Sequence, residues 1–114
     1  MNDLEATLKR AADRYLVALR YKIARFEDCN RALLRDEEVE LQPMLVLADQ
    51  IKSSGASFGF DDVSMVAFEI EARLSSIARN YSKEQVVRLS VEIERLKRVV
   101  CELAYHAQNR EYGY

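Results

Sequence analysis

Turn-forming residues are scarce in this sequence of 114 residues, which contains 3 glycines and 1 proline. Tryptophan is absent, while 49% of the residues are apolar and 32% are charged. A sheet protein needs many tight turns, for which glycine and proline are the preferred residues. The scarcity of both therefore favours an all-helical protein. The length suffices for a single domain, residues 1–114, with one apolar core.

An excess of charge of either sign is also absent. The chain has 17 basic and 19 acidic residues, with a net charge of −2, and so offers no field that would attract nucleic acid or an anionic membrane. No apolar run approaches the ~20 residues that a membrane span needs. The N-terminus has no basic segment followed by an apolar one, so no secretory signal is visible. We therefore expect a cytoplasmic protein with neither a nucleic-acid nor a membrane partner.

Histidine and cysteine, the residues of many catalytic and metal sites, are rare. His106 is the single histidine, and we interpret it as a surface residue near the end of the last helix. Cys29 and Cys101 have no paired spacing, which predicts two reduced, partly buried thiols. Three such scattered residues give neither metal-ligand spacing nor a catalytic triad. We expect no metal, no cofactor and no enzymatic activity.

What the sequence does have is apolar residues at steps of three and four, the spacing of amphipathic helices. It predicts helices from residue 3 to about 30, from about 40 to 59, from 61 to 80 and from 83 to about 110. The charged stretch 35–38 is interpreted as an exposed connection, and we expect residues 111–114 to be frayed. Four helices with short links predict an all-α, antiparallel up-down-up-down four-helix bundle.

Each helix has a face that we expect to point into the core. These faces hold Leu4, Leu8, Ala11, Tyr15, Leu19, Ile23 and Phe26 in the first helix; Leu41, Met44, Ala48, Ile51, Gly55 and Phe58 in the second; Val63, Val66, Ala67, Ile70, Leu74 and Ile77 in the third; and Val86, Leu89, Ile93, Leu96, Val100, Leu103 and Ala107 in the fourth.

Signals for the helix ends agree with this division. Candidate N-caps precede three helices: Asn2 or Asp3, Asp61 or Asp62, and Ser82. Pro43 is tolerated only in the first turn of a helix, which places the start of the second helix near Glu40 or Leu41. Ser82 and Gln85 have the spacing of a capping box, in which the glutamine side chain reaches back to the serine.

The second helix contains a stretch of unusual composition, residues 48–59, with the sequence Ala-Asp-Gln-Ile-Lys-Ser-Ser-Gly-Ala-Ser-Phe-Gly. Propensity alone favours a loop at residues 53–55, but the apolar spacing continues to Phe58, and we expect helix up to Gly59. The small residues at 53–57 leave one helix face almost bare, so another surface could approach the backbone there. Asp49 and Lys52 lie at the edge of that bare patch.

This stretch resembles the signature of histidine-containing phosphotransfer (HPt) domains, which runs roughly A-H-x-L-K-G-S-[SA]-A-x-[FL]-G. The positions in register are Ala48, Ile51 (for Leu), Lys52, Ser54, Ala56, Phe58 and Gly59. Asp49 stands where the family has its phosphorylated histidine, and Ser53 stands where the next glycine usually lies. The resemblance covers residues 40–72 closely, and it too implies a four-helix bundle.

In the family, the histidine accepts a phosphoryl group from a receiver domain and passes it on. Asp49 is a poorer nucleophile than imidazole, is shorter, and carries a negative charge toward the acidic pocket of a receiver. The resemblance therefore implies a pseudo-HPt domain, a pseudo-phosphotransferase of a two-component phosphorelay that binds a receiver domain or histidine kinase without carrying phosphate. Helical spacing gives its expected docking face: Leu45, Asp49, Lys52, Ser53 and Ala56.

Other interpretations fit the same residues. The chain could be a helical scaffold unrelated to phosphorelays, or an active phosphotransferase whose histidine was substituted. Asp49 could also be a plain surface acid paired with Lys52 at i,i+3, worth ~0.2–0.5 kcal/mol. A phosphatase-like role for Asp49 and Gln50 is disfavoured, because adjacent residues lie about 100° apart around a helix.

Overall fold

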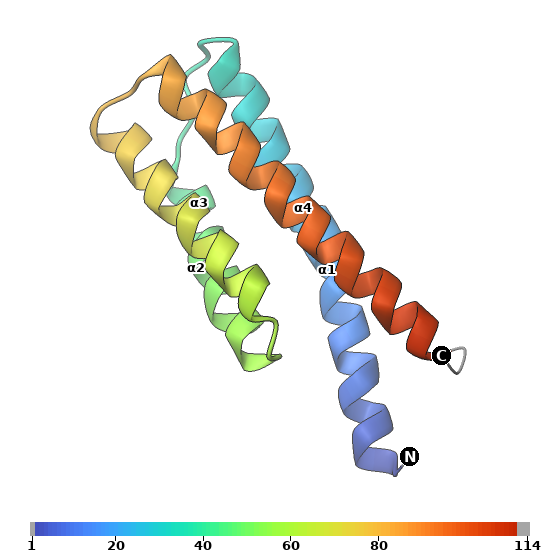
Figure 1. Ribbon diagram of the computed structural model, residues 1–114. Coiled ribbons are helices and arrows are strands. Elements are labelled where there is room, and N and C mark those ends of the chain that lie inside the picture. Colours follow the sequence, from blue (N-terminus) through green and yellow to red (C-terminus); the bar gives the residue numbers. More distant parts are fainter. Residues whose placement is uncertain (1, 112–114) are drawn as a thin grey trace.

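The computed structural model describes residues 2–111, with side chains as far as Ala107. It contains four helices: α1 (Asp3–Leu34), α2 (Gln42–Ser57), α3 (Asp61–Arg79) and α4 (Lys83–Glu111). Consecutive helices run in opposite directions (Figure 1). The described residues thus form the all-α four-helix bundle that the sequence predicts. Of the predicted frayed tail, Glu111 is still helical, and residues 112–114 lie outside the described residues.

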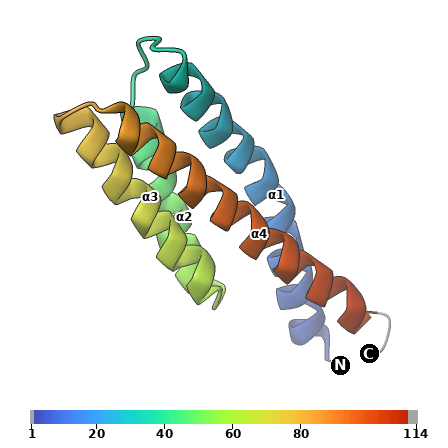
Figure 2. The ribbon, with the colours of Figure 1, turned by 45° about the horizontal axis from the view of Figure 1, so that its top comes forward.

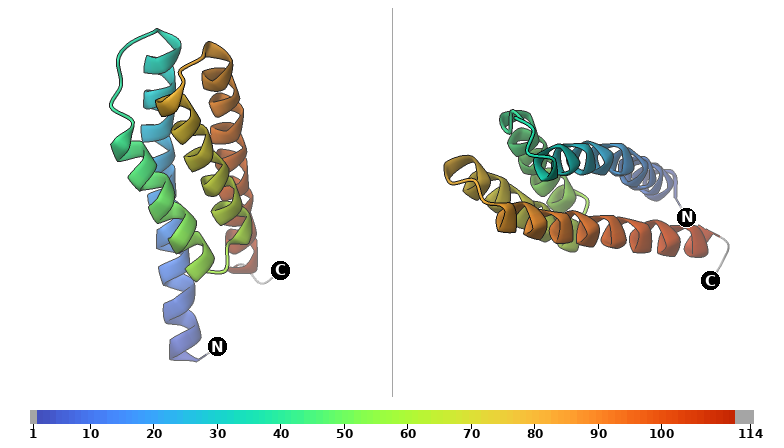
Figure 3. Two further views of the ribbon diagram at one scale, coloured as in Figure 1. Left: turned by 90° about the vertical axis from the view of Figure 1, so that its left-hand side faces the viewer. Right: turned by 90° about the horizontal axis from the view of Figure 1, so that it is seen from above.

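The four helices are not equivalent neighbours. α2 and α3 form a closely packed hairpin, α3 also packs against α4, and α4 packs against α1, whereas α1 and α2 meet over a small area. The long helices α1 and α4 continue past the connection between α2 and α3 (Figures 2 and 3). The molecule is consequently elongated, measuring 51 × 21 × 18 Å.

The core is a continuous cluster of apolar side chains from all four helices. All six residues expected on the inward face of α3 are buried, and so are those of α4 up to Val100. The expectation is wrong at the ends of two other faces. Leu4 and Leu8 are exposed near the N-terminal end of α1, which continues past the α2–α3 hairpin (Figure 3), and Phe58 is exposed in the connection between α2 and α3.

Both ends of the first connection are fixed by backbone hydrogen bonds. α1 continues to Leu34, four residues past the predicted end, and closes with Asp36 in the left-handed region at φ 59°. The Asp36 N–H donates to the Leu33 carbonyl and the Glu37 N–H to the Ala32 carbonyl, which is the Schellman pattern. α2 then begins at Gln42 with Pro43 in its first turn, close to the predicted start.

The connection between α2 and α3, residues 58–60, is longer than expected, because α2 ends at Ser57 and not at Gly59. Gly59 adopts φ 78°, and the Phe60 N–H donates to the Gly55 carbonyl at 2.8 Å, so α2 also ends in a Schellman motif. The Phe60 carbonyl then accepts the N–H of Ser64 and begins α3. Because Phe60 occupies the N-cap position, the prediction that Asp61 or Asp62 caps α3 is wrong. Both acids lie in the first turn, where they favour the helix dipole.

The predicted caps of α1 and α4 form, but the predicted capping box of α4 does not form completely. Asn2 caps α1 by accepting the Glu5 N–H at 2.7 Å. Ser82 caps α4 by accepting the Gln85 N–H at 3.2 Å, but only half of the predicted capping box forms. The Gln85 side chain accepts a hydrogen bond from Arg73 on α3 instead of reaching back to Ser82.

The two thiols lie in different surroundings. Cys29 is buried in the core, and this burial raises the pKa of its thiol. Cys101 is exposed on α4, so the prediction of partial burial is wrong for this residue. Both cysteines are free thiols, as predicted. Among the described residues, no helix combines the length and the apolar character needed to cross a membrane.

Candidate docking face

α2 stays helical through the serine and glycine residues that propensity would assign to a loop. The Ser54 hydroxyl donates to the Gln50 carbonyl at 2.8 Å and lies 2.6 Å from the Tyr15 hydroxyl of α1. The Ser57 hydroxyl donates to the Ser53 carbonyl at 3.1 Å. These serines thus bond to carbonyls of their own helix instead of drawing the backbone into a turn.

Gly55 belongs to the inner side of α2, where it allows α3 to approach. A Cβ atom at Gly55 would lie 3.2 Å from the backbone nitrogen of Ser64 and 3.2 Å from Cγ1 of Val63. The Ser64 hydroxyl crosses the same gap and donates to the Lys52 carbonyl at 2.7 Å. The small residue at position 55 therefore serves the fold, whereas Ser53 and Ala56 face solvent.

Asp49 lies exposed on α2 and forms an ion pair with Lys52, with 3.1 Å between Oδ1 and Nζ. The same Lys52 Nζ lies 3.0 Å from Oε1 of Glu71 on α3 and 5.7 Å from the centre of the Phe68 ring. The hydrogen bond to Glu71, and after it the one to Asp49, raises the pKa of Lys52. Lys52 is thus held between two carboxylates and carries no free positive charge toward solvent.

The structure corrects and extends the predicted face. Leu45 is half-buried against the core, not exposed, so it contributes less surface than expected. Sequence reasoning missed the contribution of α3, namely Glu71 and the exposed apolar residues Met65 and Phe68. A signal was available, because Met65 and Phe68 are large apolar residues that fall outside the inward positions of their helix. We call Leu45, Asp49, Lys52, Ser53, Ala56, Met65, Phe68 and Glu71 the Asp49 face.

The remaining polar groups do not form an open site. His106 is exposed near the end of α4, as expected, and its ring meets that of Tyr105 edge-on. Within residues 2–107 no three potential metal ligands are grouped. No buried side-chain polar atom in this part of the chain lacks a hydrogen-bond partner.

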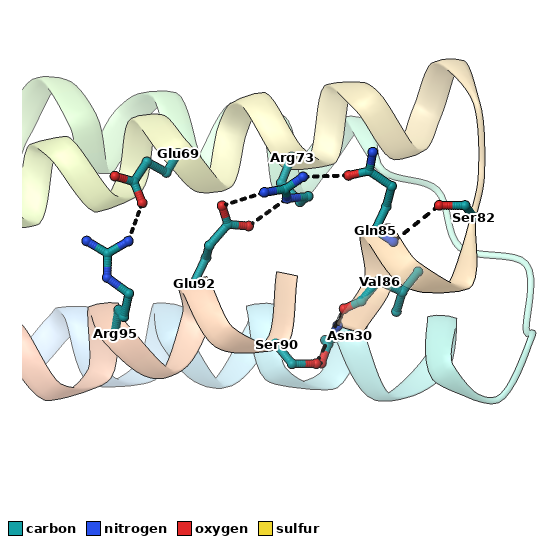
Figure 4. A network of polar contacts seen from close by, with 9 residues as sticks. All are labelled: Asn30, Glu69, Arg73, Ser82, Gln85, Val86, Ser90, Glu92 and Arg95. Carbon is teal, nitrogen blue, oxygen red and sulfur yellow. Dashed lines mark hydrogen bonds and ion pairs between the residues drawn. The ribbon is translucent and has the colours of Figure 1, made fainter. Parts of the chain in front are cut away.

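A cluster of polar side chains joins α3 to α4, and its members bond to one another (Figure 4). Arg73 donates to Glu92 at 2.9 and 3.2 Å and to Gln85 at 2.6 Å, and Arg95 donates to Glu69 at 2.6 Å. Nearby, the buried Asn30 side chain donates to the Val86 carbonyl at 3.0 Å and accepts from Ser90. These contacts hold the helices in register and leave no group free for chemistry.

No protein-family model, no curated protein and no solved structure matches this chain. The resemblance at residues 48–59 therefore depends on the residues themselves.

Proposed function

We propose that this protein is a pseudo-HPt domain, which binds a receiver domain or a histidine kinase of a phosphorelay through the Asp49 face and carries no phosphate. The observation that carries the proposal is the position of Asp49. It is exposed on α2 at the acceptor position of the signature, next to Lys52 and to the small, solvent-facing residues Ser53 and Ala56.

The charges of this face argue against phosphoryl transfer. A carboxylate at position 49 is a poor nucleophile, and the lysine beside it is already neutralised by Asp49 and Glu71. The three groups together carry a net charge of −1, so an incoming phosphoryl group would be repelled instead of stabilised. Docking without transfer is the function that this arrangement supports.

The shape of the face suits a protein partner. Ser53 and Ala56 present little beyond the backbone, so a partner helix could approach α2 closely. Met65 and Phe68 add exposed apolar surface on α3, and aromatic residues and methionine are enriched at the centres of protein interfaces. A purely solvated helix face would more often carry long charged side chains at these positions.

Binding to a panel of purified receiver domains and histidine kinases tests the proposal. Ala56→Arg places a long charged side chain in the middle of the Asp49 face and should abolish binding while preserving the helical circular dichroism spectrum. Ala24→Arg is the matched control, since Ala24 is an exposed alanine on α1, and it should bind like the wild type. If Ala56→Arg leaves every interaction intact, the scaffold interpretation replaces this one.

A phosphorylation assay tests the second half of the proposal. The wild-type chain should take no acid-labile label from a phosphorylated receiver or kinase. Asp49→His combined with Ser53→Gly restores the nucleophile and the clearance beside it, and should permit slow labelling by a receiver that binds. Label on the wild-type protein that disappears in His106→Ala would refute the proposal that this chain carries no phosphate.

A further inference from the structure

α1 and α4 continue past the α2–α3 hairpin (Figure 3). We call residues 3–12 of α1 and 103–107 of α4 the overhang; its inner part, at Leu8, Ala12 and Leu103, borders the hairpin tip. The core-facing stripe of α1 continues along this overhang through Leu4, Leu8 and Ala12, at steps of four residues. Among the described residues little covers these leucines, since Leu4 is 67% exposed and Leu8 is 59% exposed. An inward-type apolar stripe is therefore left open to solvent.

A groove of about 440 Å³ lies where this stripe passes under the hairpin. α1 contributes Leu8, Ala12 and Leu16, the hairpin tip contributes Phe58 and Phe60, and α4 contributes Leu103. The Phe58 ring stacks on Tyr15 with centroids 4.6 Å apart, which fixes one wall. The charged residues lining the groove are Lys9 and Asp13, and they neutralise each other in an ion pair of 3.0 Å. The groove is thus apolar and selects no charged ligand.

We propose that a second copy of this chain covers the groove, with Leu4 and Leu8 of each copy seated against the overhang of the other. The overhang carries the exposed leucines, and the groove that would receive them lies between the overhang and the hairpin tip. A surface that contains both halves of a contact is what a two-fold symmetric interface requires. The net charge of −2 per chain opposes this association only weakly.

The spacing of the α1 stripe specifies the register. If a two-fold axis passes near Leu8, the two α1 helices run antiparallel and Leu8 faces its counterpart. Leu4 of one copy then faces Ala12 of the other, because both lie four residues from Leu8. The large residue is matched to the small one, which is the pairing that fills a helix interface without voids.

The size of the overhang sets the strength of the association. The α1 part of the overhang is about 15 Å long, the α4 part is about 8 Å long, and each helix is about 10 Å wide, which gives roughly 230 Å² of projected surface per copy. A total of roughly 460 Å² is well below the ~1,200 Å² of stable interfaces and allows only a weak, transient association. We therefore expect a dimer that dissociates with a constant of about 0.1–1 mM and whose formation does not depend on the proposed receiver binding.

Sedimentation equilibrium on the full chain, from about 20 µM to 2 mM, measures this dissociation constant directly. Leu4→Glu combined with Leu8→Glu should raise it at least about tenfold, because two charges enter the contact. Val17→Glu combined with Tyr21→Glu is the matched control: these residues also lie four apart on α1, and they are 53% and 74% exposed. The control should change the dissociation constant less than about twofold.

All four substituted residues are exposed in a single copy, so both double variants should keep the helical circular dichroism spectrum. A chain that stays monomeric at 2 mM, roughly the upper limit of the expected range, would overturn the proposal. It would equally be overturned if the dimer survived Leu4→Glu/Leu8→Glu unchanged, or if the control weakened it as much.

Discussion

α3 contacts its two neighbours by different means. Toward α4 it extends long charged side chains, with Arg73 bonded to Glu92 and Gln85, and Glu69 bonded to Arg95 (Figure 4). Toward α2 it uses close approach, since a Cβ atom at Gly55 would lie only 3.2 Å from the backbone nitrogen of Ser64. The ionised pair on that side is formed by Lys52 and Glu71, at the outer edge of the contact.

The difference explains why the Asp49 face, and not the surface over α3 and α4, is the candidate docking site. Long ion-paired side chains cover the α3–α4 contact and satisfy one another. Close packing at the α2–α3 contact brings two backbones together under short side chains, and leaves Ser53 and Ala56 bare beside exposed Phe68. The polar groups of the α3–α4 contact bond to one another, whereas the α2–α3 contact leaves an exposed surface of short and apolar side chains, on which we propose that a partner docks.

Both helix contacts include residues of the shared apolar core. Disrupting this core should therefore cause the largest loss of stability. Leu96 of α4 is fully buried, so Leu96→Asp would place an unpaired charge in the core at a cost of several kcal/mol, comparable with total stabilities of about 5–15 kcal/mol. We expect loss of the cooperative thermal transition in circular dichroism. Val91→Asp, at an exposed position of the same helix, should fold normally. A folded Leu96→Asp protein would mean that α4 faces another way.

The close approach at the α2–α3 contact is tested by Gly55→Val. Its Cβ would already meet the Ser64 backbone nitrogen, which cannot move as a side chain end could, so we expect a loss of about 2–3 kcal/mol in urea unfolding. Ser53→Val introduces the same side chain at an exposed position of the same helix and should cost less than about 1 kcal/mol. Equal losses in the two variants would show that helix propensity, and not close approach, governs position 55.

The sequence predicted much of this arrangement because helix periodicity reports directly on burial. The inward faces of α3 and α4 follow from spacing alone. What it missed depends on how helices meet. The backbone of Phe60 bonds to the end of α2 and also occupies the N-cap position of α3, so Asp61 is not the cap. Arg73 of α3 donates a hydrogen bond to the Gln85 side chain, which therefore does not complete the capping box with Ser82.

The Asp49 face was foreseen only on the side of α2, for the same reason. Periodicity within one helix groups Asp49, Lys52 and Ala56, but the partnership of Lys52 with Glu71 and Phe68 needs the angle and distance between two helices. The exposed leucines of α1 were missed because their spacing is that of a core face. Only the relative lengths of the helices show that α1 continues past the α2–α3 hairpin, so that its N-terminal leucines stay largely exposed.

The charged contact between α3 and α4 should be less costly to break than the close one. Arg73→Met leaves the buried carboxylate of Glu92 without its partner, and we expect a loss of about 1–2 kcal/mol in urea unfolding. Arg88→Met, which removes an exposed ion pair with Glu84 on α4, should cost less than about 0.5 kcal/mol. Changing both Arg73 and Glu92 to methionine should recover most of the loss. If Arg73→Met costs no more than Arg88→Met, the α3–α4 ion pairs are only a surface feature.

The smallest expected effect is a pH dependence of stability, which should differ between the lysine pair at the α2–α3 contact and the arginine pair at the α3–α4 contact. The pKa of Lys52 is raised in the folded state by Glu71 and then by Asp49. Its contribution to stability is therefore fully present below the unfolded value of about 10.4, and is lost as the pH rises through the folded value. Glu71→Gln removes the first of these partners. The difference in urea midpoint between the wild type and Glu71→Gln should thus stay constant from pH 8 to about 10 and then shrink. Arg73 stays protonated throughout this range, so the corresponding difference for Arg73→Met should not change. A difference for Glu71→Gln that persists at the highest pH would mean that Glu71 stabilises the bundle by packing and not by its charge.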